Sequence, residues 1–420
     1  MPPNAAHLTT AGSDDTTKPQ PTRFVARQPI FDRKLRVIGY ELLFRDGVQN
    51  SFCAPDLDAA CRSTLDSSWL MGFDILCSGA LAFINCTREA LLGGYSTLLP
   101  PRSTVVEVLE TVAPDPEIFT VCRDLKSAGY LIALDDFIPN DPREPLVELA
   151  DIIKLELPAT PRKDWKQIVQ HYESRSIRML AEKVETHQEF LATQEAGFTY
   201  FQGYFFQKPV TLSTTEVPGS KIHYLRMIQA ASHPDLNWEE VEGIVKQEPS
   251  LCYRLLRYLN SPAFGFRAEI KSVRHALTIL GEREIRKWVS VVATLALGRE
   301  KPGELIQTAL LRGHFCELIS DKLHQRKADY FLLGLLSLMD AILGLPMIEV
   351  LRRVSVDRKI KLALLRETSP LLPIYELVLA HEAADWLRCR SLSQQLRLEE
   401  AALADLYLES VKWSRAVMQS

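Results

Sequence analysis

The chain has 420 residues, of which 46% are hydrophobic and 24% charged. This composition is typical of a globular protein and excludes a mainly disordered, collagenous or coiled-coil chain. A single hydrophobic core stops growing at about 250–300 residues, so two domains are expected. Lys and Arg number 49 and Asp and Glu 53, for a formal net charge of -4. That balance excludes a protein whose main work is to coat nucleic acid or an anionic membrane.

Residues 1–22 contain almost no large apolar side chains, so we expect a disordered tail, and they lack the pattern of a secretory signal. The longest apolar stretch, Phe331 to Leu351, is interrupted by Asp340 and Pro346. A bilayer span needs about 20 nearly uninterrupted apolar residues. None of the eight cysteines forms a Cys-x-x-Cys pair, which favours buried thiols in a reducing compartment. We therefore expect a soluble, cytoplasmic protein that does not contact a membrane.

Residues 23–210 alternate short apolar runs with longer amphipathic segments. Solid apolar runs are typical of parallel strands that are buried on both faces. The predicted strands are Val37–Leu43, Leu81–Asn85, Val105–Leu109, Leu131–Leu134, Ile152–Leu155, Ile177–Ala181 and Thr199–Phe201. Strands that alternate with helices in this way indicate an α/β domain, built either as a barrel or as a doubly wound sheet.

Polar side chains lie within or directly after every one of these runs. They are Glu41, Asn85, Glu107, Glu110, Asp135, Asp136, Lys154, Glu182 and Gln202. An acidic residue at a strand end is commonly only a helix cap or a turn residue. A charge beside a buried strand is costly, however, unless it is paired or bound to a metal ion. Because the carboxyl ends of barrel strands converge on one mouth, the recurrence at all seven strands favours a shared site.

Such a site would be strongly negative and would offer oxygen ligands without His or Cys. Oxygen ligands select Mg²⁺, Mn²⁺ or Ca²⁺. Two such ions about 3.5–4 Å apart are a standard device for phosphodiester hydrolysis.

The same residues resemble a known family, the EAL domain. The signature Glu-Ala-Leu-x-Arg stands here as Glu41-Leu42-Leu43-Phe44-Arg45, and the resemblance runs from Gln28-Pro29-Ile30 to Gln202-Gly203-Tyr204-Phe205-Phe206-Gln207-Lys208-Pro209. The family fold is a modified TIM barrel, and its activity is hydrolysis of cyclic di-GMP to the linear dinucleotide pGpG. The resemblance therefore implies an EAL-like barrel with phosphodiesterase activity over residues 23–210.

The resemblance also implies a role for each polar residue. Two metal ions, Mg²⁺ or Mn²⁺, would be held by Glu41, Asn85, Glu107, Asp135, Asp136 and Gln202. Contacts to cyclic di-GMP would come from Gln28, Leu43 and Arg45. Lys154, together with Gln202, would position the attacking water, and Glu182 would be the general base that takes its proton. Glu110 would brace the loop after Asp136.

Three departures from the family pattern lie close to these residues. The sequence Asp-Asp-Phe is followed by Ile138-Pro139-Asn140-Asp141-Pro142, where the family has a flexible loop with Gly, Thr and Ser that couples dimerisation to metal binding. Lys183 stands where Gly is expected after the general base, and Glu156 stands where Asp is expected after Lys154. We therefore expect a stiffer loop, and a misplacement of about 1 Å can cost on the order of a hundredfold in rate.

Residues 211–220 are polar with Pro and Gly and are predicted to form a linker, and residues 221–420 have helical periodicity. The turn Asn260-Ser261-Pro262-Ala263-Phe264-Gly265 and the run from Ala276 to Gly281 resemble the HDOD domain. This domain is a helical relative of the metal-dependent HD phosphohydrolases. The likeness covers roughly His223 to Arg390 and predicts an all-α, HD-like domain.

A catalytic HD domain needs a His-Asp pair, and none is present here. His275 is followed by Ala276, His314 by Phe315 and His381 by Glu382, so each is interpreted as an ordinary helix residue. The basic residues of this half are read either as a solvated helix face or as a surface that docks a protein partner. They are Arg254, Arg257, Arg267, Lys271 and Arg274.

The sequence thus predicts a bacterial cyclic di-GMP phosphodiesterase whose HDOD domain regulates the barrel or binds another protein. One alternative is a receptor that captures cyclic di-GMP without useful turnover, and another is a scaffold that binds no nucleotide. A homodimer is possible, and no nucleic-acid polymer is expected as a partner.

Overall fold

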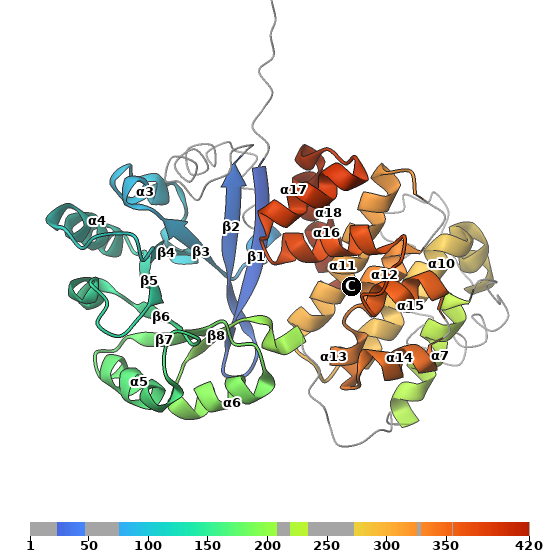
Figure 1. Ribbon diagram of the computed structural model, residues 1–420, viewed down its shortest axis with the longest axis horizontal. Helices are drawn as coiled ribbons and strands as arrows, with labels where there is room; N and C mark the ends of the chain where they lie inside the picture. Colours follow the sequence, from blue (N-terminus) through green and yellow to red (C-terminus); the bar gives the residue numbers. More distant parts are fainter. Residues whose placement is uncertain are drawn as a thin grey trace, which may run out of the picture.

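The structure is a computed structural model and describes residues 23–46, 75–207, 219–233, 273–325, 329–354 and 356–419. It contains a closed barrel and a group of helices that packs beside it (Figure 1). This is the α/β barrel followed by a helical domain that the sequence predicted.

The barrel closes in sequence order from the first strand to the eighth. Its strands are β1 (Arg23–Asp32), β2 (Val37–Asp46), β3 (Leu81–Cys86), β4 (Thr104–Val108), β5 (Leu131–Phe137), β6 (Ile152–Glu156), β7 (Arg178–Glu182) and β8 (Tyr200–Gln202). β1 runs antiparallel to both of its neighbours, and the other pairs are parallel. The seven predicted strands are all present with shifted ends. Sequence analysis missed β1, because Pro29 and Arg27 break the apolar pattern of a central strand.

In the described part of the barrel domain, four α-helices and several 3₁₀ turns surround the strands. The helices are α3 (Arg88–Leu92), α4 (Pro116–Ser127), α5 (Trp165–Glu173) and α6 (His187–Ala196). The 3₁₀ turns are η1 (Tyr95–Leu98), η2 (Pro101–Ser103), η3 (Glu144–Leu149), η4 (Arg162–Asp164) and η5 (Tyr204–Gln207). Local sequence sets their ends. Asp115 caps α4 just before Pro116, and Thr186 and Glu189 form a capping box that starts α6.

One layer of apolar side chains fills the barrel interior. Its members are Ile30, Phe83, Val105, Ala133, Ile152 and Leu180. At the same level β2 carries Gly39, where a Cβ atom would lie 2.6 Å from the Phe83 ring, so only glycine fits. Because side chains alternate along a strand, the residues two positions beyond this layer also face the interior. The layer therefore forms the floor of the barrel mouth.

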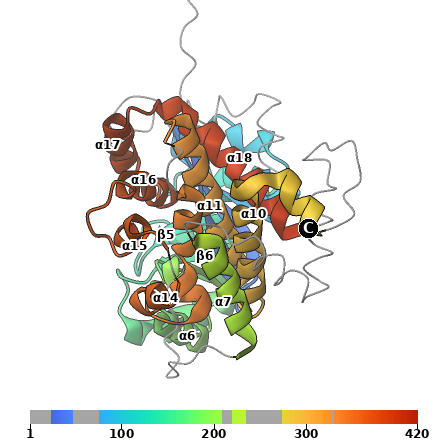
Figure 2. The same cartoon turned by 90° about the vertical axis from the view of Figure 1, so that its right-hand side faces the viewer.

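The second half is helical. Its elements are α7 (Gly219–Ser232), α10 (Val273–Leu297), α11 (Gly303–Lys322), α12 (Tyr330–Leu336), α13 (Met339–Leu343), α14 (Met347–Arg353), α15 (Arg358–Leu364), α16 (Leu372–Glu382), α17 (Trp386–Leu396) and α18 (Glu400–Gln419). The central helix α11 packs against α12, α16 and α18 (Figure 2). Gly281, with φ 74°, breaks the helical path of α10. No helix among the described residues is both long and apolar enough to span a bilayer.

Candidate active site at the barrel mouth

Most of the polar residues predicted from the sequence meet at the barrel mouth. These residues lie two positions along their strands from the apolar floor, on the same inner face. They are Gln28, Glu41, Asn85, Glu107, Asp135, Lys154, Glu182 and Gln202. Hydrogen bonds join them across strands that are distant in sequence. Asn85 Nδ2 donates to Glu41 Oε1 at 2.8 Å, and Gln202 Nε2 donates to Glu41 Oε2 at 2.6 Å. Gln202 Nε2 also lies 3.2 Å from Gln28 Oε1, so β1 and β8 close the site.

Lys154 occupies the centre of a ring of carboxylates. Its Nζ lies 2.6 Å from Asp135, 2.7 Å from Glu107, 3.1 Å from Glu182 and 3.4 Å from Glu41. Burial opposes the charged ammonium, but the carboxylates outweigh it and hold the pKa of Lys154 well above its usual range. One ammonium facing four carboxylates leaves negative charge in excess. Burial disfavours such an excess, which bound cations or protonation of the carboxyls would relieve.

Several acceptor atoms at the mouth have no hydrogen-bond donor. The buried oxygens without one are Asn85 Oδ1, Glu107 Oε2, Glu182 Oε2 and Gln202 Oε1. A buried polar atom left unsatisfied costs about 1–3 kcal/mol. Carboxylate and amide oxygens are the ligands that hard divalent cations prefer. The donor set therefore fits the metal ions that the sequence predicted here.

Two of the mouth carboxyls have pKa values displaced toward the protonated form. Burial raises the pKa of Glu182 to about 8, with Lys154 opposing part of the shift. Burial likewise raises the pKa of Glu107 well above its usual range. A carboxyl with a pKa near neutrality is suited to accept and release a proton at physiological pH. Glu182 must be ionised to act as the general base that the sequence predicts, and cations bound at the mouth would favour that form.

A β-bulge brings two consecutive acidic residues to the same mouth. The register between β5 and β6 shifts after Leu134, and Asp136 adopts the left-handed backbone at φ 42°. Neighbouring residues of a regular strand point to opposite faces, whereas a bulge can re-aim one of them. Carboxylate oxygens of Asp135, Asp136 and Glu110 all lie within 4.8 Å of one another. Glu110, predicted to brace the loop, is thus also placed where it could hold an ion.

Two of the three departures from the family pattern, Glu156 and Lys183, contact each other. Lys183 Nζ lies 2.6 Å from Glu156 Oε1 and 3.5 Å from Asp136 Oδ1. Lys183 also adopts the left-handed backbone, with φ 58°. Its side chain is half exposed, so the ammonium can move away from Asp136 into solvent. In this position it supplies positive charge to Asp136, the carboxylate that is predicted to reach a second ion.

The loop after Asp136 is fixed by Arg143, a residue that sequence reasoning missed. Arg143 is fully buried and binds the Asp141 carboxylate through Nε at 2.9 Å and Nη2 at 2.7 Å. It also donates to the backbone carbonyl oxygens of Val108 at 2.9 Å and Asp135 at 2.7 Å. The loop therefore has a rigid support of its own. The pattern Asp-x-Arg was the available signal, because a short acid–base pair beside prolines is typical of a fixed turn.

Some predicted residues are only partly described. Leu43 lies on β2 with a half-buried side chain, and Arg45 pairs with Phe24 through the backbone, its side chain lying outside the described residues. The turn Asn260–Gly265 and the basic residues from Arg254 to Lys271 also lie outside them. The same holds for the side chains of Arg274 and His275.

Two histidines of the helical domain are buried among aromatic rings. His314 stacks on Trp413 with ring centroids 4.5 Å apart. Both ring nitrogens of His381 lack a hydrogen-bond partner, and its ring contacts Phe315 and Tyr407. Burial lowers the pKa of each histidine to about 3, so both are neutral at physiological pH. Within the described residues, the group at Glu110 is the one set of three acids or histidines close enough to share a metal ion.

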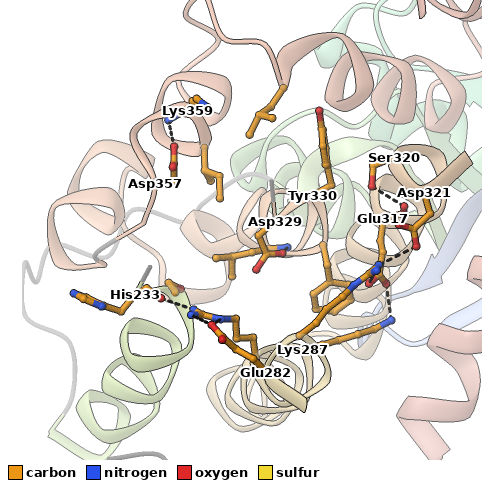
Figure 3. A pocket seen from close by; sticks show the side chains of 17 residues that line it. His233, Glu282, Lys287, Glu317, Ser320, Asp321, Asp329, Tyr330, Asp357 and Lys359 are labelled. Atoms are coloured by element: carbon orange, nitrogen blue, oxygen red, sulfur yellow. Dashed lines mark hydrogen bonds and ion pairs between the residues drawn. The ribbon is translucent and has the colours of Figure 1, made fainter. Parts of the chain in front are cut away.

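The helical domain also contains a cavity of about 540 Å³ between α10, α11, α12 and α15, with several charged side chains in its lining (Figure 3). Its charges neutralise one another. Arg283 lies 2.8 Å from Glu317 and 2.9 Å from Asp321, and Lys287 Nζ lies 2.5 Å from the other Glu317 oxygen. These pairs link α10 to α11 and give the cavity wall a structural role.

Comparisons with known proteins agree with this arrangement. The EAL domain model matches residues 83–209, and the HDOD domain model matches residues 218–349. The Bacillus subtilis protein YuxH is 33% identical, over 94% of this chain and 99% of its own length. The cyclic di-GMP phosphodiesterase CdgJ of Vibrio cholerae is 31% identical, over 94% of this chain and 93% of its own length.

Among solved structures, the calcium and cyclic di-GMP complex of Klebsiella pneumoniae BlrP1 is 25% identical, with a TM-score of 0.38. The match covers 44% of this chain and 54%, about half, of the BlrP1 chain. Two full-length relatives above 30% identity and both domain models lead to one conclusion. The chain belongs to the family of proteins in which an EAL domain is followed by an HDOD domain.

Proposed function

We propose that the protein is a divalent-metal-dependent phosphodiesterase that hydrolyses cyclic di-GMP to linear pGpG at the barrel mouth. The observation that carries the proposal is the ring of four carboxylates around Lys154, with unsatisfied oxygens from Asn85 and Gln202 beside it. The activity named for CdgJ, a relative over nearly its whole length, supports the same function.

Each residue of the mouth has a defined task in this proposal. The metal ligands would be Glu41, Asn85, Glu107, Asp135, Asp136 and Gln202. When bound, the ions would polarise the phosphoryl group and stabilise the charge that develops on its oxygens. Glu182 would accept the proton of the attacking water, and Lys154, together with Gln202, would position that water. Gln28, Leu43 and Arg45 would contact the dinucleotide.

We further propose that the ions are Mg²⁺ or Mn²⁺ and that two can bind. The second would lie toward Asp136 and Glu110, whose carboxylates approach Asp135. Ca²⁺ should support less turnover, because it accepts looser geometry and polarises the phosphoryl group less strongly. Equal rates with Ca²⁺ and Mg²⁺ would contradict a reaction that depends on closely held ions.

A receptor with little turnover is the second candidate, and the position of Lys183 favours it. An ammonium beside Asp136 competes with a cation for that carboxylate. In that case cyclic di-GMP would bind at the mouth, and the helical domain would relay this state to a protein partner. The cytoplasmic location and the possible homodimer are also proposals. So is the division of the chain into a tail (1–22), a barrel (23–210), a linker (211–220) and a helical domain (221–420).

The deciding experiment follows cyclic di-GMP by chromatography with purified full-length protein in Mg²⁺, Mn²⁺ or chelator. Phosphodiesterase function requires metal-dependent formation of pGpG with the wild-type chain. Tight binding of cyclic di-GMP without product would establish the receptor instead. Absence of both would reject the two candidates together.

A further inference from the structure

The helical domain packs against the outer side of β1. A tight turn after Asp32 joins these strands, with the Leu35 amide donating to the Asp32 carbonyl at 3.0 Å and no helix between them. In a regular β/α barrel, each strand is covered by the helix that follows it. Here α16 and α18 of the helical domain lie against β1 (Figure 1). Among the described residues, the second domain therefore supplies helices that pack on the outside of β1.

A buried polar cluster of Arg27, Tyr40 and Glu304 joins the two domains at this face. The Tyr40 hydroxyl donates to Glu304 Oε2 at 2.7 Å, and Arg27 Nη2 lies 3.8 Å from Glu304 Oε1. The Arg27 guanidinium also lies over the Tyr40 ring, 4.3 Å from its centroid. The three residues are 6%, 2% and 7% exposed, respectively. Buried groups of this kind are costly unless each is paired, so the cluster specifies one arrangement of the two domains.

The barrel residues of this cluster are chain neighbours of residues at the mouth. Tyr40 precedes Glu41 and Arg27 precedes Gln28, and successive side chains of a strand point to opposite faces. Gln28 and Glu41 are also paired in the β1–β2 ladder. A shift of β2 that moved Tyr40 would therefore move Glu41, which Asn85 and Gln202 hold on the inner side.

A second contact ties the end of the barrel to the same domain. Arg312 on α11 donates to Gln207 Oε1 at 2.6 Å, and Gln207 Nε2 donates to Glu382 Oε1 at 2.7 Å. Arg312 and Glu382 are themselves paired at 2.7 Å. Gln207 follows β8, the strand that ends at Gln202. Helix α11 thus contacts β2 through Glu304 and the 3₁₀ turn η5, which follows β8, through Arg312.

From this geometry we infer that Tyr40 and Glu304 are positioning residues for Glu41, so that docking of the helical domain sets the metal affinity and turnover of the barrel. The inference rests on the proposed function, because it assigns Glu41 to a metal ion. Neither residue contacts the mouth directly. Their effect passes through the backbone of β2.

The test compares Tyr40→Phe with Tyr130→Phe in the full chain. Tyr130 is a matched control, because it is equally buried and its hydroxyl donates to the Leu99 carbonyl at 2.6 Å within the barrel. Both variants lose one buried hydrogen bond and keep the aromatic ring. Mn²⁺ affinity is measured by calorimetry without substrate, alongside kcat and KM for cyclic di-GMP. We expect about tenfold weaker Mn²⁺ binding and a lower kcat for Tyr40→Phe alone, since partners that orient a ligand typically contribute 10–100-fold.

Variants on the helical side test the same contact from the other domain. Glu304→Ala should reproduce the Tyr40→Phe effect, and the double variant should cost little more than either single one. Glu304→Gln retains an oxygen that can accept the Tyr40 hydrogen bond and should restore most of the Mn²⁺ affinity. If Tyr40→Phe fails to fold, the two Glu304 variants test the inference by themselves.

The inference is overturned if Tyr40→Phe and Tyr130→Phe shift Mn²⁺ affinity equally, or if thermal stability falls while Mn²⁺ affinity stays at the wild-type value. A wild-type chain that neither binds Mn²⁺ nor hydrolyses cyclic di-GMP would instead reject the proposed function. The two failures are therefore distinguishable.

Discussion

Arg143 donates to the backbone carbonyl of Asp135 at 2.7 Å, and its side chain is fully buried. The same guanidinium holds Asp141 and the Val108 carbonyl, so one side chain connects the ends of β4 and β5 to the loop between Ile138 and Pro142. This loop contains no glycine, and the Arg143–Asp141 pair supports it. The position of the Asp135 carboxylate thus depends on a pair that does not itself face the mouth.

Arg143→Lys should therefore reduce both stability and activity. A lysine cannot form the bidentate contact, and breaking a buried pair typically costs about 3–5 kcal/mol. We expect the free energy of unfolding to fall by about that amount and hydrolysis to fall at least about tenfold, because small misplacements at a site are costly. Denaturant titration and a hydrolysis assay measure the two effects. Arg175→Lys is the control, since its pair with Glu144 is half exposed and should contribute under about 1 kcal/mol. Similar effects for both variants would contradict the role of Arg143.

Glu182→Gln separates binding from chemistry. The amide keeps the shape of the side chain but cannot accept the proton of water, so hydrolysis should fall at least about a hundredfold. Cyclic di-GMP should still bind, which calorimetry can measure. Glu195→Gln on the exposed face of α6 removes a similar charge outside the mouth and should leave the rate unchanged. An intact rate in Glu182→Gln would show that another group is the base.

Lys183→Gly tests whether the lysine competes with a cation at Asp136. Removing the ammonium should strengthen binding of the weaker of two Mn²⁺ ions, by about threefold or more, because a charge 3.5 Å from the carboxylate is lost. Calorimetric titration of Mn²⁺ in the absence of substrate gives the stoichiometry and both affinities. Ser176→Gly is the matched control, because Ser176 also has a left-handed backbone, with φ 64°. Ser176→Gly relieves the same backbone strain but lies away from the mouth. If both variants changed Mn²⁺ affinity equally, competition between Lys183 and a cation would be rejected.

The buried histidines predict a pH dependence of stability. The folded-state pKa of His381 is lowered to about 3 by burial, while an unfolded histidine titrates near 6.5. Below pH 6.5 the unfolded chain binds a proton that the folded chain excludes. The free energy of unfolding should therefore fall as pH decreases from about 6.5 toward 3, by up to about 1.4 kcal/mol per pH unit for each such histidine. His314 contributes with the same sign, because burial lowers its pKa also.

His381→Phe should remove one of these two contributions and reduce the slope accordingly. The ring would pack against Phe315 and Tyr407 without burying unpaired nitrogens, so stability at pH 7 should hold or rise. Denaturant titrations between pH 5 and 7.5 measure the slope. His171→Phe, at an exposed position on α5, should leave the slope unchanged. A slope as steep as that of the wild type in His381→Phe would show that His381 does not contribute to it.

The polar residues of the barrel mouth were predictable because the pattern that identifies them lies within single short strands. Each inward polar residue stands two positions beyond an apolar residue of the same strand, as Lys154 does beyond Ile152, so alternation alone predicts which face it takes. Seven strands and the predicted mouth residues on them follow from this pattern. β1 escaped prediction because an antiparallel strand with Arg27 and Pro29 does not read as a continuous apolar run.

The sequence by itself determined seven of the eight strands, the inward carboxylates and the resemblance to the EAL and HDOD families, since each depends on residues close together in the chain. Only the tertiary structure decided how distant residues support them. The bulge at Asp136, the Arg143 contact with Val108 and the hydrogen bond from Tyr40 to Glu304 depend on backbone register and on contacts between remote segments. Tyr40 and Glu304 are 264 residues apart, and no periodic pattern in a single chain links positions at that separation. Their pairing is set by the burial of both groups at one interface, where an unpaired carboxylate would be too costly to retain.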